Sequence, residues 1–228
     1  MKKLITPILL GAALFLGIST SMAQQPTSQA AAPVAQQPPP SPIPLLQTLS
    51  NQMISALKAN KASMQKEPQV VYQIVQQILL PSADLEAMAR SALGRDAWLS
   101  ATPAQQQAFI GAFTNLMVHT YAAGLSSYTD ETVQFDPIRG GIQSGQNRVE
   151  VNSQIIRTDG PPILVSYRLI YKQQKGGTYD WLVYDFSVEG ISMIESFRSQ
   201  FSAELSGGVS IDALTAKLNQ HNTQANPS

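Results

Sequence analysis

The chain has 228 residues, 43% of them hydrophobic and 13% charged, so it is long enough and apolar enough to fold around one sizeable core. Lysine plus arginine and aspartate plus glutamate number 15 each, and this balance gives no electrostatic reason to expect nucleic-acid binding. Cysteine is absent, which excludes disulfides, thiolate nucleophiles and cysteine-ligated metals. The two histidines, His119 and His221, leave few candidates for a histidine-rich metal site or a Ser-His-Asp triad.

Residues 1–23 have the pattern of a secretory signal peptide. Lys2 and Lys3 form a positive start, an apolar run follows, and Ser21 and Ala23 place small residues before a cleavage site after Ala23. The apolar run is shorter than the ~20 residues that a membrane-spanning helix needs, which favours cleavage over a retained anchor. We therefore expect a protein exported to the periplasm. Without the signal peptide the chain has 13 basic and 15 acidic residues, a net charge of −2.

Residues 24–44 predict a disordered tether. They are almost all Gln, Ala, Pro and Ser, with seven prolines and no charged residue. Proline fixes φ and removes a hydrogen-bond donor, so such a stretch is expected to be extended and solvated. The folded domain is expected to span residues 45–222, followed by a short disordered tail over residues 223–228.

Hydrophobic residues at spacings of three and four predict helices after the tether. The first begins at Leu45. Pro68 opens a second helix that Pro81 closes, and Ser82 is expected to cap a third that ends at Gly94. These helices precede the longest one in the chain.

The longest helix is expected from Pro103 to about Ser126. Thr102 and Gln105 form a capping box around the proline at the first helical position. Residues four apart lie on one stripe of a helix. One stripe of this helix carries Phe113, Met117 and Tyr121.

Beyond Tyr128 the hydrophobic period changes to two, which predicts four antiparallel strands. They lie around residues 133–135, 149–155, 163–171 and 182–188, and glycine-containing turns connect them. In the last strand the apolar set is Leu182, Tyr184, Phe186 and Val188. Helices return with a capping box from Ser192 to Glu195, and Ser210 is expected to cap the final helix. This order predicts an α+β fold, a single domain in which helices wrap one face of a twisted antiparallel sheet.

Few residues suggest chemistry. Asp84 and Glu86 lie two apart on a helix and do not face each other, which favours simple surface solvation. The position of His119 inside the long helix indicates a structural role rather than that of a general base. The position of Asp185, in a strand between Tyr184 and Phe186, indicates a buried carboxylate that accepts hydrogen bonds from the backbone. We therefore assign no catalytic residue, no metal site and no cofactor, and expect a protein that is not an enzyme.

From about Leu45 to Asn222 the sequence resembles the MlaC family, the periplasmic phospholipid-binding proteins of the pathway that maintains lipid asymmetry, also called toluene-tolerance proteins. The most specific segment is residues 181–194, with the order Trp-x-Val-Tyr-Asp followed by Glu-Gly-Ile-Ser. Further support comes from residues 93–94, 102–106, 113–121 and 198–201. The long Pro/Gln tether is a departure from the family pattern.

The resemblance implies a carrier that shuttles phospholipid between the outer and inner membranes, with the bound lipid as cargo. It implies two partners besides phospholipid: an outer-membrane lipoprotein–porin complex and an inner-membrane ABC transporter with an MCE-domain subunit. It also implies a sheet wrapped by helices, similar to nuclear transport factor 2 or cystatin, with an apolar pocket between them. The acyl tails would lie in that pocket and the headgroup in solvent.

Candidate lining residues for the pocket come from the long helix and from one face of the strands. The opposite strand face, with Leu164, Ser166, Arg168 and Ile170, contains a charge that a lipid tail would reject. The candidates are Phe113, Met117, Tyr121, Val151, Val165, Tyr167 and Leu169. Two alternatives stay open: an enzyme on the same fold, such as an isomerase or dehydratase acting on an apolar small molecule, and a periplasmic chaperone or interaction module with a filled core.

Overall fold

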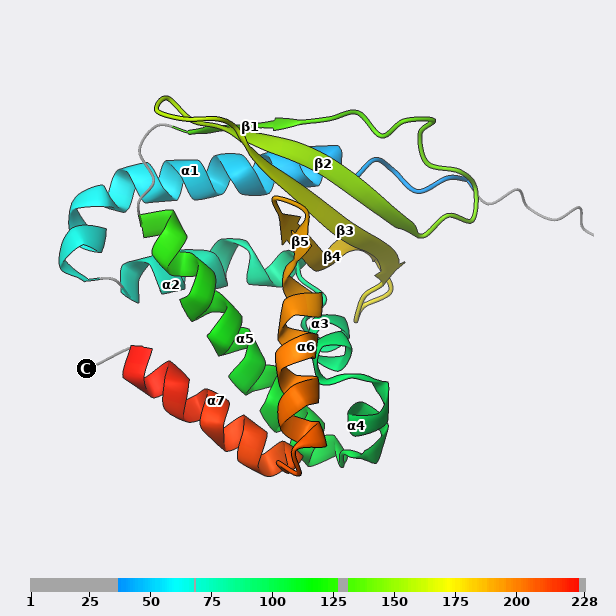
Figure 1. Cartoon of the computed structure of the whole chain (residues 1–228). Coiled ribbons are helices and arrows are strands. Elements are labelled where there is room, and N and C mark those ends of the chain that lie inside the picture. Colours follow the sequence, from blue (N-terminus) through cyan, green and yellow to red (C-terminus); the bar gives the residue numbers. More distant parts are fainter. Residues whose placement is uncertain (1–36, 68, 127–130, 226–228) are drawn as a thin grey trace, which may run out of the picture. The chain divides into compact units, whose positions relative to one another are not determined.

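The computed structural model describes residues 37–67, 69–126 and 131–225; the predicted signal peptide and tether residues 24–36 lie outside them. Helices come first, then strands, then helices again, as the hydrophobic periods predict (Figure 1). The helices are α1 (Ile43–Lys66), α2 (Gln69–Ile78), η1 (Leu80–Ser82), α3 (Leu85–Leu93), α4 (Arg95–Ser100), α5 (Pro103–Ser126), α6 (Met193–Ser206) and α7 (Ile211–Ala225). The strands are β1 (Thr132–Phe135), β2 (Arg148–Ile156), β3 (Ile163–Gln173), β4 (Tyr179–Val188) and β5 (Ile191–Ser192).

The strands form one antiparallel sheet in the order β1-β2-β3-β4-β5, so each strand pairs with its neighbour in sequence. Four of them match the predicted strands. The fifth, β5, has two residues and returns from β4 through a tight turn at Glu189 and Gly190, both with positive φ. It was not predicted because two residues are too few for a period to appear in the sequence.

A β-bulge in β4 changes which residues share a face of the sheet. Arg168 pairs with Asp185, but Leu169 pairs with Val183, so Tyr184 has no partner residue in β3. A bulge residue shifts the alternation of side chains by one position. The predicted apolar set of β4 was therefore wrong in its first half: Val183, and not Leu182 or Tyr184, shares a face with Phe186.

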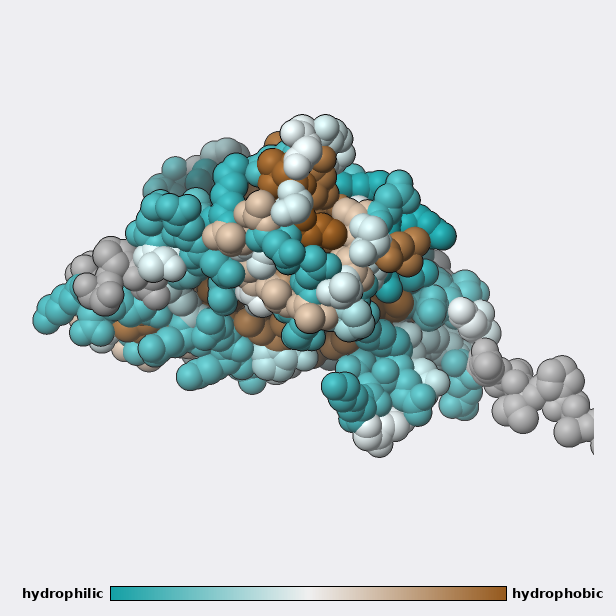
Figure 2. Space-filling view, turned by 90° about the horizontal axis from the view of Figure 1, so that it is seen from below, coloured by the Kyte–Doolittle hydropathy of each residue, from teal (hydrophilic) through white to brown (hydrophobic). Residues whose placement is uncertain are grey.

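The helices lie on one side of the sheet, and the face that they cover is called the inner face here (Figure 1). Registered pairs place Val151 opposite Tyr167 and Val149 opposite Leu169 on this face. The other face is open in its middle, where the side chain of Arg168 is 47% exposed, but on β4 Leu182 and Asp185 of that face are buried. The helical side itself is largely hydrophilic at its rim, with hydrophobic residues gathered near the middle (Figure 2).

Of the predicted helix starts, those at Thr102, Ser192 and Ser210 are confirmed, the one at Ser82 is wrong, and the one at Pro68 lies outside the described residues. The capping box at α5 is reciprocal, since the Thr102 amide donates to Gln105 Oε1 and the Gln105 amide donates to Thr102 Oγ1. Ser192 and Ser210 accept from backbone amides at the starts of α6 and α7. Ser82, however, lies within η1, and α3 is capped by the side chain of Asp84.

The folded domain begins and ends beyond the predicted boundaries. Helix α1 starts at Ile43, Pro42 is fully buried, and the indole Nε1–H of Trp181 donates to the Pro40 carbonyl at 2.7 Å. The last residues of the predicted tether, from Pro40 on, are therefore part of the domain. At the other end α7 continues to Ala225, so residues 223–225 of the predicted tail are helical.

This boundary predicts different effects for two truncations of the mature chain. A chain that starts at residue 37 should unfold at the same temperature as one that starts at residue 24. A chain that starts at residue 43 should lose about 1–2 kcal/mol of unfolding free energy, because it lacks the Trp181 hydrogen bond and a buried proline. Thermal unfolding by circular dichroism measures both, and equal melting temperatures for all three chains would contradict the boundary.

Candidate functional site

The three predicted lining residues of α5 lie in a cluster made mainly of helices. Phe113 is fully buried, its ring stacked on Phe109 with centroids 5.8 Å apart and met edge-on by Phe197 and Phe201. Met117 is buried in the same cluster. We call this the helical cluster; its buried aromatic residues are Trp98, Phe109, Phe113, Phe197 and Phe201. Phe113 is thus a core residue with aromatic neighbours on several sides.

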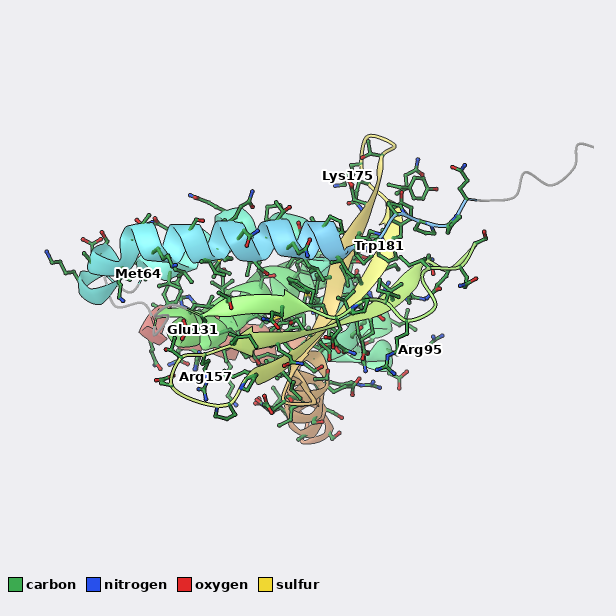
Figure 3. All side chains as sticks on the ribbon, turned by 90° about the horizontal axis from the view of Figure 1, so that it is seen from above. Met64, Arg95, Glu131, Arg157, Lys175 and Trp181 are labelled. Carbon is green, nitrogen blue, oxygen red and sulfur yellow. The ribbon has the colours of Figure 1, made fainter. Side chains whose placement is uncertain are left out.

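The predicted strand residues lie in a second cluster under the start of α1. Val151 and Leu169 are fully buried there, and Tyr167 packs against the same group. We call this the sheet cluster; its buried members are Leu46, Val149, Val151, Leu169 and Trp181. Seen from above, α1 runs from beside Trp181 to Met64, so its first turn covers this end of the sheet (Figure 3).

The two clusters meet at Tyr121. Its ring contacts Phe186 of β4 edge-on, with centroids 5.2 Å apart, and its hydroxyl donates to the sulfur of Met193 at the start of α6. Phe186 is in turn registered with Tyr167 on β3. We call this junction of Tyr121, Phe186 and Tyr167 the seam, because it joins α5 to the inner face of the sheet.

Val165 extends the seam along the inner face. It is 6% exposed and is registered between Ser153 on β2 and Val188 on β4. The structure thus puts all four strand candidates on the side of the helices. Phe186, which completes the seam, was not among the predicted residues, although its place in the alternating pattern of β4 was a usable signal.

The seam is apolar but contains two hydroxyl groups. Burial raises the pKa of Tyr121, and the nearby Asp185 carboxylate raises it further. Burial also raises the pKa of Tyr167, against a smaller opposing effect of its hydrogen bond with Ser153. Both phenols therefore remain neutral donors at physiological pH, so the seam adds no charge to the apolar space.

Asp185 is a buried structural acid, as the sequence predicts. Its side chain is 7% exposed and accepts from the Ser192 hydroxyl at 2.8 Å and from the Ile194 amide at 3.3 Å. Arg168 Nη1 lies 3.4 Å from Oδ2. Because these amide and hydroxyl donors belong to the first turn of α6, the carboxylate also meets the positive end of that helix.

Asp84 is not the solvated surface residue that the sequence predicts. It is buried, caps α3 by accepting from the Ala87 amide, and forms an ion pair with Lys172 at 2.6 Å. Its own amide donates to the Val183 carbonyl of β4. Asp84 and Asp185 therefore fasten α3 and α6, respectively, to the same strand.

His119 lies apart from Asp185, where α2 and α5 pack together. Its ring meets Tyr72 edge-on with centroids 4.3 Å apart. Within the part of the chain that the structure describes, buried His119 Nδ1 has no hydrogen-bond partner. Burial lowers the pKa of His119, and the neighbouring His221 lowers it further. The edge-on packing against Tyr72 between α2 and α5 favours the predicted structural role.

A cavity of about 840 Å³ opens elsewhere, between the β1–β2 loop and β2. Its lining is mostly polar and includes Asp136, Arg139 and Glu150; of the predicted residues only Val151 contributes. In residues 37–67, 69–126 and 131–225, no three His, Asp or Glu side chains gather where they could hold a metal ion. No helix in the same ranges is long and apolar enough to cross a membrane.

Comparison with known proteins gives consistent results. Residues 47–220 match the family described as MlaC protein. The chain is 29% identical over 187 residues to the intermembrane phospholipid transport system binding protein MlaC of Haemophilus influenzae, covering 81% of this chain and 83% of that one. It is 27% identical over 161 residues to toluene tolerance protein ttg2D of Pseudomonas putida, covering 71% of each.

A solved structure is also similar. It is the phospholipid-binding protein from Ralstonia solanacearum in complex with a phospholipid. The TM-score is 0.68 at 28% identity, and the match covers 79% of this chain and 96% of that one. Nearly the whole of that lipid-bound protein thus has its counterpart here.

The Asp185 contacts predict a marked loss of stability on removal of the carboxylate. Asp185→Ala should lower the free energy of unfolding by about 2–3 kcal/mol, because buried donors of α6 lose their acceptor. Glu150→Ala is the matched control: Glu150 contacts the same Arg168 but is half exposed, so the loss should be under about 1 kcal/mol. Urea unfolding measures both, and equal losses would contradict the structural role of Asp185.

The lowered pKa of His119 predicts a pH dependence of stability. The unfolded chain binds this proton with a pKa near 6.5 and the folded chain binds it less readily. Stability should therefore be full above pH 6.5 and fall as the pH drops below it, since the unfolded state then holds more protons. His119→Gln should make the urea midpoint nearly independent of pH between 7.5 and 5. His221→Gln should leave most of the pH dependence in place, because burial is the larger cause of the lowered pKa. A larger effect of His221→Gln than of His119→Gln would refute this assignment.

Proposed function

The chain belongs to the MlaC family, and on that premise we propose that it is a periplasmic carrier that moves phospholipid between the outer and inner membranes. It is a phospholipid-binding transport protein by this membership. The observation that carries the proposal is the match to the Ralstonia solanacearum protein, which covers 96% of a chain that was solved with a phospholipid bound. The fold therefore supplies a frame that holds such a lipid in a relative.

Solvation energy explains why such a transfer needs a protein. A phospholipid with ~30 methylenes in its tails would lose on the order of 24 kcal/mol on exposing them to water, at ~0.8 kcal/mol each. A carrier needs an apolar container of sufficient length, and it needs no reacting group. Helix α5 has 24 residues and so extends about 36 Å. One leaflet of tails spans roughly 15 Å, half of the ~30 Å hydrocarbon core, so α5 is long enough to wall them.

We place the acyl tails at the seam, between α5 and the inner face of the sheet. Tyr121, Tyr167 and Val165 carry this assignment because they lie where the helical cluster and the sheet cluster meet. Among the described residues the aromatic contacts across the seam are few, and a third buried cluster, which includes Met53 of α1, Val71 of α2 and Val118 of α5, holds α5 beside α1 away from the seam. Tails that enter here would displace the Tyr121 ring from Phe186. Met117, Val151 and Leu169 would line the space, while Phe113 would support it from behind.

Methionines favour a space that changes its shape. Every methionine of the described residues is buried, and Met117 and Met193 flank the seam. An unbranched thioether repacks at low cost, so these side chains can follow tails of different length or saturation. The buried methionines are Met53, Met64, Met88, Met117 and Met193.

The remaining assignments complete the proposal. The signal peptide would be cleaved after Ala23 and the mature protein released into the periplasm. It would receive and deliver lipid at an outer-membrane lipoprotein–porin complex and at an inner-membrane ABC transporter with an MCE-domain subunit. The near balance of charge suits brief docking, because a strongly charged carrier would be held by one partner or by anionic headgroups.

We infer further that the protein does not catalyse a reaction and uses no cofactor apart from its cargo. Asp185 is occupied by hydroxyl, amide and guanidinium donors, so its lone pairs are committed to holding α6. His119 packs on Tyr72 in a different region. The two residues that an enzyme on this fold would use therefore have structural roles.

Organic-solvent extraction tests the function directly. Protein purified without detergent from the periplasm should yield about one phospholipid per chain, and native mass spectrometry should show the added mass. Chaperone function predicts the bare polypeptide mass. Enzyme function predicts turnover of an apolar substrate that is lost in Asp185→Asn. Bare protein, under conditions in which other lipid carriers keep their cargo, would refute the proposal.

A pair of strand variants tests where the tails lie. Val165→Arg places a charge on the inner face at the seam and should lower bound phospholipid at least about tenfold, since a charged group is costly among tails. Glu150→Leu, at a half-exposed position on the outer face, should leave lipid content unchanged. Circular dichroism must show both variants folded. A folded Val165→Arg protein with full lipid content, or a loss confined to Glu150→Leu, would show that the tails lie elsewhere.

A further inference from the structure

We propose that Tyr171, Tyr179 and Trp181 form a recognition surface for a proline-rich segment, and that its ligand is residues 37–42 of this same chain. The segment joins the predicted tether to α1, and the three aromatic residues belong to the β3–β4 hairpin. The two parts are thus far apart in sequence, and their contact is a tertiary one.

The direct contact is a hydrogen bond from an aromatic side chain to a proline carbonyl. Trp181 Nε1–H donates to the Pro40 carbonyl oxygen at 2.7 Å, across 141 positions of the sequence. Trp181 is only 5% exposed and Pro42 is fully buried, so this end of the segment is packed into the domain. An indole that donates to the backbone of a proline-rich ligand is the contact that aromatic-lined grooves use to hold such peptides.

The segment is stiff before it binds. Three consecutive prolines, Pro38 to Pro40, have φ fixed near −65°. Gln37, Pro38, Pro39 and Ser41 each precede a proline, which restricts them to extended conformations. An extended proline-rich segment loses little conformational entropy on docking, so a small contact area is sufficient to hold it. It also carries no charge, which suits an aromatic surface.

The aromatic residues lie on one face. Tyr171 is registered with Trp181, and Gln173 with Tyr179, so the three rings project from the inner face at the end of the hairpin. The Tyr171 ring lies 5.2 Å from that of Trp181 and 5.6 Å from that of Tyr179. Tyr179 stays 54% exposed at the rim. The surface is therefore continuous, from a buried indole that donates to the segment to an open phenol.

Docking of the segment sets the position of α1. The Leu46 amide donates to the Pro42 carbonyl as the first bond of the helix, and the Leu46 side chain packs in the sheet cluster with Trp181. The segment thus acts as a latch that holds the first turn of α1 over Val151 and Leu169. The claim that this latch closes one end of the lipid site rests on the proposed function, whereas the existence of the latch is independent of that function.

Two full-length mature variants test the latch. Trp181→Phe keeps an aromatic ring and removes the N–H donor. The triple variant Pro38→Ala, Pro39→Ala, Pro40→Ala keeps the carbonyl but frees the backbone, and its first and last positions are exposed, so the core stays intact. Both should raise hydrogen exchange of the Leu46 amide about tenfold, the factor for loss of about one hydrogen bond. Pro26→Ala with Pro33→Ala, earlier in the tether, is the matched control and should leave exchange unchanged.

A binding experiment with a separate peptide tests whether the surface recognises the segment or contacts it only because the two are covalently linked. A peptide with the sequence of residues 36–44, added to the triple proline variant, should return the Trp181 indole proton resonance toward its wild-type shift. The same peptide with alanine at the three prolines should not. The indole of Trp98, buried in the helical cluster, serves as an internal reference and should not move.

Two outcomes would overturn the proposal. The first is unchanged Leu46 exchange in both variants. The second is a Trp181 indole that ignores the proline peptide at millimolar concentration. Neither readout involves lipid, so failure of the latch and failure of the proposed function are distinguishable by separate experiments.

Discussion

The carboxylate of Asp185 is the group on which the arrangement of sheet and helices depends. A charged group that is almost fully buried is tolerable only with donors around it, and its donors are the Ser192 hydroxyl and the amide of Ile194. Both belong to the start of α6, so this helix must begin against β4. That position brings Met193 to the hydroxyl of Tyr121, and Tyr121 to the ring of Phe186. One buried acid thereby fixes the geometry of the seam.

The seam separates two kinds of packing. On the helical side, four phenylalanines contact one another in a compact aromatic core; on the sheet side, aliphatic residues pack under the first turn of α1. Polar anchors lie at the edge of the sheet, where Asp84 and Asp185 bind α3 and α6 to β4. A third buried cluster joins α1, α2 and α5 away from the seam, and within the described residues the contacts across the seam itself are a few aromatic ones. If the acyl tails enter at the seam, as proposed above, these are the contacts that they would displace.

Local patterns in the sequence determined most of the elements. Alternation of apolar residues identifies β3, and the capping box at Thr102 identifies the start of α5, because both signals depend only on neighbouring residues. The stripe of Phe113, Met117 and Tyr121, and the inner face with Val165 and Leu169, follow from helix and strand periods in the same way. The burial of Asp185 was also predictable, since a lone carboxylate within a buried aromatic strand needs backbone donors.

Tertiary structure alone decided the features that depend on contacts between distant segments. The bulge at Tyr184 places Val183 on the inner face of the sheet. No residue type in the sequence indicates this bulge, because it arises from the pairing with β3. Asp84 is buried beside Val183 and Lys172, 88 positions after it, and the Pro40 carbonyl accepts a hydrogen bond from Trp181, so both depend on contacts between distant segments. Periodicity reports on one segment at a time. It therefore placed the candidate lining residues on their elements, whereas packing between segments placed Phe113 in the solid core and Tyr121 at the seam.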